Sequence, residues 1–352
     1  MTLNHSATIM VFASAIDYLL GDPWGWLHPV QVMGWVISGY TQLALKLDNS
    51  LHILGAFGVP GDTELALPRI CSPKIQRLAG VVLTIVLIGG SALVGWLIIA
   101  AARWVHPILY IVVESILLAS CFAGRSLRAA ADEAIQPLAV GDLDRTRQQL
   151  SLYVGRDTEN LSESEILRAL LETVTENAVD GVTAPLFFAI VGAIIPVGGI
   201  APFALAYKAA STLDSMVGYK EAPYTDLGMF SAKLEDLLTW LPCRLTVITL
   251  CLLSGKPGYV WRICQRDGVK DPSPNAGWSE CAYAAILGVQ LGGLNYYRGV
   301  AKYKPLLAEP IHPITTEKVY EAMQLTRYCF LIWLGLAIGL ILLTGDWGLV
   351  SV

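Results

Sequence analysis

The 352-residue sequence is poor in charge, because Asp, Glu, Lys and Arg together make up only 15% of it. Soluble globular domains carry about 25%. The formal net charge of -5 and the lack of a basic run argue against a nucleic-acid-binding surface. Hydrophobic residues reach 54%, which is too much apolar surface for a disordered chain. We therefore expect an integral membrane protein.

Several catalytic and redox motifs are also missing. The seven cysteines form no C-x-x-C pair and no metal-ligand spacing, so we interpret them as small packing residues facing a reducing side. No Walker A loop, G-x-G-x-x-G, G-x-S-x-G or H-E-x-x-H motif occurs, which argues against a lipase or a zinc protease. Residues 1–16 are apolar but lack Lys and Arg, unlike a signal peptide.

Long apolar runs predict membrane-spanning helices. Crossing the hydrocarbon core takes roughly 20 helical residues. Leu78–Ala102 is uncharged throughout and is bracketed by Arg77 and Arg103, and Tyr328–Gly345 is a second such run. Pro107–Ala123 is shorter and contains Glu114, which in lipid would be costly. We expect Glu114 to face other helices or to be protonated.

Two further apolar runs predict re-entrant hairpins, which return the chain to the side of the membrane that it left. Val182–Tyr207 is broken by Pro196, Gly198 and Gly199, and Leu241–Ser254 is too short to span and includes Arg244. Irregular backbone at membrane depth is tolerated where protein buries it or water reaches it.

The polar stretches 124–181, 208–239 and 255–280 would then lie on one face of the membrane, and the arginines of the first favour the cytosol. The predicted fold is all-α: a single domain, residues 1–352, forming a polytopic helical bundle with re-entrant or broken helices and amphipathic extramembrane helices. The expected location is the inner (cytoplasmic) membrane, and the orientation of the N-terminus stays open.

A helix after Ser162 is predicted by a capping box with Glu165. At about 100° per residue, Glu172, Glu176 and Asp180 fall opposite its apolar stripe, with only Arg168 near them. A solvated helix face is the ordinary explanation of such acids. Acids without nearby basic residues to offset their repulsion also suit a Mg²⁺ site, because Mg²⁺ typically uses one or two carboxylates and substrate phosphates.

Two other segments offer polar groups for a phosphate. Lys208 shares a helix face with Ser211, Thr212 and Ser215, and Asp214 lies at its border. This arrangement fits a phosphate seat or a snorkelling lysine. Residues 267–280 form a turn-rich loop before a helix, where backbone amides could hold an anion or simply connect two elements.

Six segments in chain order resemble the adenosylcobinamide-phosphate synthase family of cobalamin biosynthesis, integral membrane proteins of bacteria and archaea. They are GDPWGWLHPVQVMG (21–34), GRDTENLSESEI (155–166), ETVTENAVDGVTAPLF (172–187), YKAASTLDSMVGYK (207–220), KDPSPNAGWSE (270–280) and LGGLNYYRG (291–299). Two departures are Ser211, where many relatives have Asn, and a longer insert over 45–77.

The resemblance implies that a propionate carboxyl of adenosylcobyric acid is joined to (R)-1-amino-2-propanol or its phosphate. It also implies ATP as co-substrate with Mg²⁺, and contacts with the bilayer and with other cobalamin-assembly enzymes, but no nucleic acid. The catalytic candidates are Asp157, Glu172, Glu176 and Asp180, of which Glu176 and Asp180 are the metal candidates. The candidates for binding substrate or phosphate are Lys208, Thr212, Asp214, Lys220, Asn275 and His28.

A transporter or a scaffold for corrinoid assembly is the alternative, with Glu114 and the broken segment lining a pathway. A transporter should bury ionisable groups at mid-membrane. Most of the ionisable residues here lie in the polar stretches instead, which favours an enzyme.

Overall fold

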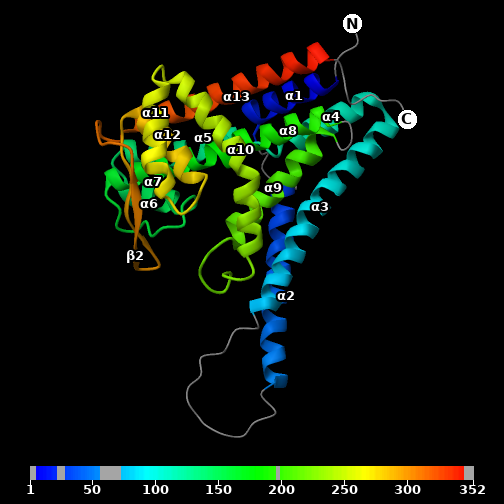
Figure 1. Ribbon diagram of the computed structural model, residues 1–352, viewed down its shortest axis with the longest axis horizontal. Helices are drawn as coiled ribbons and strands as arrows, with labels where there is room; N and C mark the ends of the chain where they lie inside the picture. The colour runs from blue at the N-terminus through cyan, green and yellow to red at the C-terminus, as the bar shows by residue number, and fades with distance from the viewer. Residues whose placement is uncertain (1–4, 22–27, 56–72, 196–198, 345–352) are drawn as a thin grey trace.

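The computed structural model describes residues 5–21, 28–55, 73–195 and 199–344, without the side chains of residues 46–55. Long apolar helices gather on one side of the molecule, and shorter helices with a β-hairpin form a compact unit on the other (Figure 1). The α-helices are α1 (His5–Leu19), α2 (Pro29–Gly55), α3 (Pro73–Val105), α4 (Pro107–Ala119), α5 (Gly124–Ala139), α6 (Leu143–Leu150), α7 (Glu163–Asn177), α8 (Ala184–Ile194), α9 (Ile200–Val217), α10 (Met229–Leu253), α11 (Pro257–Asp267), α12 (Ala276–Leu287) and α13 (Thr316–Thr344). A π-helical segment η2 (Ala178–Thr183) joins α7 to α8, and a short 3-10 helix η3 (Gly268–Lys270) follows α11.

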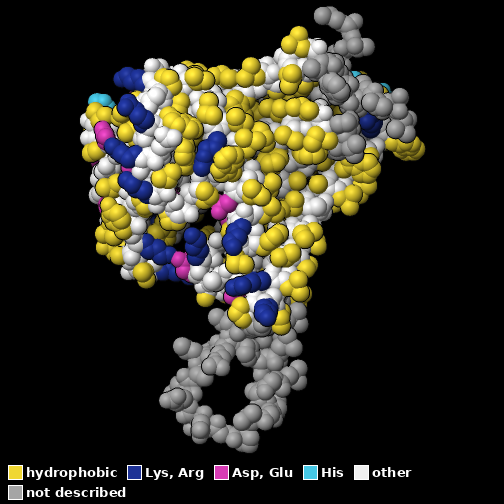
Figure 2. All heavy atoms as spheres, in the orientation of Figure 1, with side chains coloured by type: hydrophobic (Ala, Val, Ile, Leu, Met, Phe, Trp, Pro, Cys, Tyr) yellow, Lys and Arg dark blue, Asp and Glu magenta, His cyan; other side chains and the backbone are white. Residues whose placement is uncertain are grey.

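Within the described residues, five helical segments are long and apolar enough to cross a membrane: Pro73–Val105, Pro107–Ala139, Glu163–Ile194, Met229–Leu253 and Thr316–Leu343. Leu78–Ala102 lies inside the first, and the described part of Tyr328–Gly345 lies in α13, so the predicted multi-pass helical fold is confirmed. Ile85, Val86 and Leu93 of α3 are each more than half exposed, as expected for side chains that face lipid. Hydrophobic side chains cover most of the face seen in Figure 2.

The predicted break in Val182–Tyr207 is confirmed. The chain passes through η2 and α8 and then returns as α9, which packs against α8. Gly199 has a φ of 84°, which glycine adopts without the penalty of a Cβ atom. Pro196 and Gly198 lie outside the described residues.

The hairpin predicted for Leu241–Ser254 is wrong, because these residues form the second half of the continuous 25-residue helix α10. Charged residues before Leu241 ended the apolar run in the sequence but not the helix. Pro242 is accommodated within α10. The polar loop after η3 nevertheless returns to the middle of α10, where Arg244 donates to the carbonyl of Pro274 at 3.0 Å.

The β-hairpin is the exception to the predicted all-α fold. Strands β1 (Leu291–Tyr297) and β2 (Val300–Leu307) pair antiparallel, and Tyr297 opposes Val300. Arg298 and Gly299 both have positive φ, as a two-residue hairpin turn with the twist of its strands requires. The Gly-Gly pair and the Arg-Gly turn in LGGLNYYRG were the local signal for it.

Glu114 lies in α4 and faces other helices, as predicted. Its side chain is fully buried, and its Oε1 accepts hydrogen bonds from the backbone N–H groups of Ile200 and Ala201 at 2.8 and 3.2 Å. The first N–H groups of a helix have no partner within the helix. Glu114 therefore caps the start of α9.

We predict that replacing Glu114 by Leu lowers the free energy of unfolding by about 1–3 kcal/mol, because two buried N–H groups lose their acceptor. Glu114→Gln keeps a carbonyl acceptor and should cost less. Thermal unfolding in detergent measures both, with the lipid-facing Ile116→Leu as control. Equal stability of the Leu variant and the control would contradict the capping role.

Candidate active site

A polar cavity of about 490 Å³ opens where the three polar stretches meet the hairpin. Figure 2 shows Lys, Arg, Asp and Glu side chains gathered around a hollow on an otherwise largely hydrophobic face. Seven carboxylates and three ammonium groups line the cavity: Glu176, Asp180, Asp214, Glu221, Glu235, Asp236, Asp271, Lys220, Lys302 and Lys304. Stretches 124–181 and 208–239 contribute two and five of them, stretch 255–280 contributes Asp271, and the hairpin contributes Lys302 and Lys304.

Five of the predicted site residues line this cavity: Glu176, Asp180, Asp214, Lys220 and Asn275. Glu176 comes from the end of α7 and Asp180 from η2. A π-helical segment is wider than an α-helix and often occurs at functional sites. Glu176 and Asp180, which an ideal helix would place on one face, therefore line the same cavity, although the chain changes from an α-helix to a π-helix between them.

The loop after η3 directs unsatisfied acceptors towards the cavity. Asn275 donates through Nδ2 to the carbonyl of Asp236 at 2.8 Å, whereas its Oδ1 has no hydrogen-bond partner in the described part of the chain. Oδ2 of Asp271 also has no hydrogen-bond partner there, although Nζ of Lys304 lies 3.9 Å from it. Both side chains are buried. Buried acceptors without partners are rare, so a cation or a donor from a ligand would satisfy them.

Asp214, near the end of α9, also lines the cavity. Burial, helped by the charges of Asp236 and Glu176, raises the pKa of Asp214 to about 6. This carboxyl can thus exchange its proton close to neutral pH.

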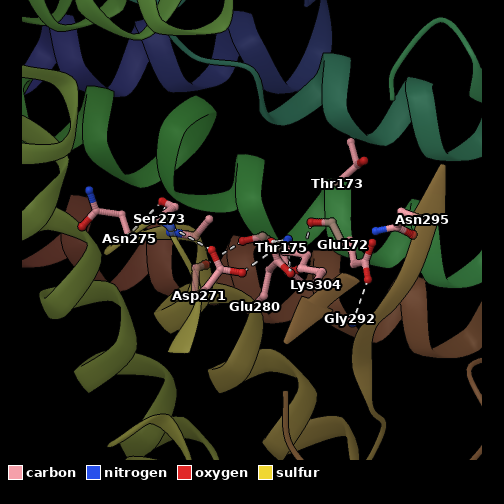
Figure 3. A network of polar contacts seen from close by, with 12 residues as sticks. Glu172, Thr173, Thr175, Asp271, Ser273, Asn275, Glu280, Gly292, Asn295 and Lys304 are labelled. Atoms are coloured by element: carbon pink, nitrogen blue, oxygen red, sulfur yellow. Dashed lines mark hydrogen bonds and ion pairs between the residues drawn. The ribbon is translucent and has the colours of Figure 1, made fainter. Parts of the chain in front are cut away.

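Lys304 of β2 is the central cation of the network in Figure 3, and sequence reasoning missed it. Its Nζ lies 2.7 Å from Oε1 and 3.0 Å from Oε2 of the fully buried Glu280. Burial opposes the charge of Lys304, but the carboxylates of Glu280, Glu176, Asp271 and Glu172 outweigh it and raise the pKa of Lys304. A lysine that stays charged here offsets part of the acidic potential of the cavity.

Glu235 was also missed. Its carboxylate lines the cavity from α10 and accepts a hydrogen bond from Thr239, while the hydroxyl of Tyr207 lies 3.5 Å from Oε1. The i, i+4 spacing of Glu235 and Thr239 is visible in the sequence, but the approach of Tyr207 from α9 is not.

Glu172 was expected to have only Arg168 near it, and this is wrong. It forms ion pairs with Arg156 and Arg168, and its Oε1 also accepts from the backbone N–H of Gly292 at 2.8 Å (Figure 3). Only 2% of its side chain is exposed, and it does not line the cavity. Helical periodicity could not show Arg156, because this residue lies in the loop before α7.

Asp157 likewise holds the hairpin. Its two carboxylate oxygens accept from the backbone N–H groups of Arg298 and Gly299 at 2.8 and 2.7 Å. Asp157 therefore fixes the positive-φ turn between β1 and β2, and it does not line the cavity.

The remaining binding candidates also lie outside the cavity lining. Lys208 does not line the cavity but interacts electrostatically with Asp180, which does. The hydroxyl of Thr212 donates to the carbonyl of Lys208 at 2.7 Å. Nδ1 of His28 accepts from the N–H of Val30 at 3.3 Å at the start of α2. Asp22 and the neighbouring tryptophans are outside the described residues.

The carboxylates of the cavity are not arranged as a preformed metal centre. In the part of the chain that the structure describes, no three His, Cys, Asp or Glu side chains converge closely enough to hold a metal ion. The donor set still fits Mg²⁺, which prefers oxygen ligands and usually completes its shell with water and substrate phosphates.

The six cysteines in the described ranges are free and buried, as expected for packing residues.

Comparison with known proteins identifies the family. A family model described as CobD/Cbib protein matches residues 10–326. A cobalamin biosynthesis protein CobD of Synechocystis sp. is 51% identical over 337 residues, covering 96% of this chain and 92% of that protein. CbiB of Salmonella typhimurium is 37% identical over 90% of this chain and 92% of its own, and CobD of Geobacter metallireducens is 38% identical over 89% of each.

No solved structure matches the chain. The family match over most of the sequence, together with relatives well above 30% identity, establishes that the chain belongs to the CobD/CbiB family of cobalamin biosynthesis proteins.

Proposed function

We propose that this protein forms the amide bond between a propionate carboxyl of adenosylcobyric acid and (R)-1-amino-2-propanol or its phosphate, using ATP. The observation that carries the proposal is the cavity in which carboxylates and lysines from four separate segments face one another. Membership of a cobalamin biosynthesis family supports the corrinoid as substrate.

Amide formation from a carboxylate needs activation, because the oxygen that must leave is a poor leaving group. We propose that a carboxylate oxygen of the corrinoid attacks the γ-phosphorus of ATP and ADP leaves. The amine then attacks the acyl carbon, loses a proton, and phosphate departs with the former carboxylate oxygen. Each step transfers negative charge onto phosphate oxygens, so cations near the phosphates would stabilise both transition states.

The cavity offers groups for these tasks. Lys220 and Lys304 would supply positive charge to the phosphates. Glu176 and Asp180 would hold Mg²⁺ together with phosphate oxygens, and the metal would neutralise charge on the transferred phosphoryl group. Asp214 is placed to take the proton that the amine loses, because the pKa of Asp214 is raised to about 6.

The geometry gives less support to a transporter or a scaffold. The ionisable groups of the cavity come from helices, from loops and from strand β2 of the compact unit, and Glu114 caps a helix. We propose that the cavity faces the cytosol across the inner membrane, where ATP is available, and that other cobalamin-assembly enzymes exchange substrates there. The arginines of the 124–181 stretch agree with this orientation.

The direct test uses purified protein in detergent. We expect ADP to form only when the corrinoid acid and aminopropanol phosphate, or aminopropanol, are both present, with one ADP for each amide formed. Chromatography of the corrinoid and a coupled ADP assay measure the two products. Amide formation without ATP, or transport of the corrinoid without any amide product, would contradict the proposal.

For the metal, we predict that Glu176→Ala or Asp180→Ala lowers kcat/KM by at least about a hundredfold at limiting Mg²⁺, because the transferred phosphoryl group loses much of its charge stabilisation. Glu163→Ala removes an exposed acid from the start of the same helix and is the control. Electron paramagnetic resonance with Mn²⁺ and ATP reports binding without turnover. Unchanged Mn²⁺ binding in both cavity variants would show that Glu176 and Asp180 are not metal ligands.

For the phosphate, Lys220→Met should raise the KM for a phosphorylated substrate about tenfold, because a charge-assisted contact is lost while the apolar stem is retained. Lys256→Met, an exposed lysine outside the cavity, should leave the KM unchanged. Lys208→Met tests whether Lys208, which interacts with Asp180 but does not line the cavity, contacts a phosphate directly. Wild-type Michaelis constants in Lys220→Met would show that Lys220 contacts no phosphate.

A further inference from the structure

A second cavity, of about 380 Å³, lies between the end of α1, the start of α5 and the middle of α13. Its lining is mostly apolar and includes Leu127, Val182, Met323, Phe330 and Leu331. The charged residues in its wall are Asp17, Arg128, Asp132 and Arg327. The cavity therefore joins a hydrophobic interior to a charged rim, next to the point where the apolar part of α13 begins.

Two guanidinium groups at the rim contact the same aromatic ring. Arg128 and Arg327 each lie 4.5 Å from the ring centroid of Tyr18. In the part of the chain that the structure describes, neither forms an ion pair with a carboxylate. Arginines without an acidic partner at the rim of one cavity can bind the oxygens of a phosphate ester.

The two acids of the rim already have hydrogen-bond donors. Asp132 accepts from the hydroxyl of Tyr320 at 2.9 Å, and Asp17 accepts from the backbone N–H of Arg125 at 3.4 Å. Neither of these hydrogen bonds involves Arg128 or Arg327, so the two guanidinium groups can still contact a ligand.

We propose that this cavity binds one anionic phospholipid, with its phosphate at Arg128 and Arg327 and an acyl chain in the apolar interior. The supporting observation is the match between the rim charge and such a lipid, in a cavity between apolar helices. Basic pockets between transmembrane helices bind anionic head groups, and each buried CH₂ of a chain adds favourable transfer energy. A free phosphate would leave the apolar part without an occupant.

The lipid site shares a wall with the proposed active site. Val182 lines the second cavity and Asp180 the first, and both belong to the six-residue π-helical segment η2. An acyl chain that fills the second cavity would therefore support the segment that carries Asp180. This consequence for turnover rests on the proposed function, whereas lipid binding does not.

Native mass spectrometry of the full-length protein, titrated with phosphatidylglycerol or phosphatidylcholine, tests the proposal. We expect one tightly bound phosphatidylglycerol on the wild type and affinity reduced about tenfold in Arg128→Gln/Arg327→Gln. Arg103→Gln is the matched control, because Arg103 also lies over a tyrosine, 5.2 Å from the ring of Tyr110, but lies outside the cavity. It should retain wild-type affinity.

Several results would overturn the proposal. Equal affinity for both lipids would mean that the cavity accepts any lipid, and an unchanged double variant would mean that the arginines do not bind the head group. Displacement of the lipid by inorganic phosphate at comparable concentration would identify a free-anion site. If the double variant does not fold, Arg327→Gln alone replaces it, since Arg327 is exposed, and the same comparison decides.

Discussion

The charges of this protein must be neutralised within the chain, because a bundle of apolar helices offers them little water. Glu172 and Lys304 show how this constraint shapes the fold. Glu172 binds two arginines and the backbone of β1, and Lys304 of β2 binds the buried Glu280 of α12. A buried charge without a partner would cost several kcal/mol, so these ion pairs fix the hairpin against α7 and α12. The cavity exists because the hairpin is held there.

Within the cavity the charges and the hydrogen-bond acceptors are only partly satisfied by other residues. Seven carboxylates face three lysines, and acceptor atoms of Asp271 and Asn275 have no donor in the described residues. An acidic surface of this kind would repel a bare phosphate, whereas a phosphate bound to Mg²⁺ carries less negative charge. Under the proposed function, the lysines would lie next to the phosphates and the carboxylates would contact the metal.

The sequence predicted those features that depend on local composition. The span Leu78–Ala102 and the break after α8 follow from run length and from Pro and Gly, and the capping box of α7 from Ser162 and Glu165. Features that depend on distant partners were missed or misassigned. Glu172 and Asp157 looked catalytic, because Arg156 and the hairpin turn that engage them come from other segments. The continuity of α10 was missed because charged residues facing the cavity interrupt its apolar run.

The central claim is that the corrinoid carboxyl is activated by transfer of the γ-phosphoryl group of ATP. It is tested most directly with a corrinoid acid whose reacting carboxylate carries ¹⁸O. The account predicts one ¹⁸O atom in inorganic phosphate for each amide formed, with ADP as the other product. Label in AMP, or amide formation with no label transferred to any phosphate, would contradict it.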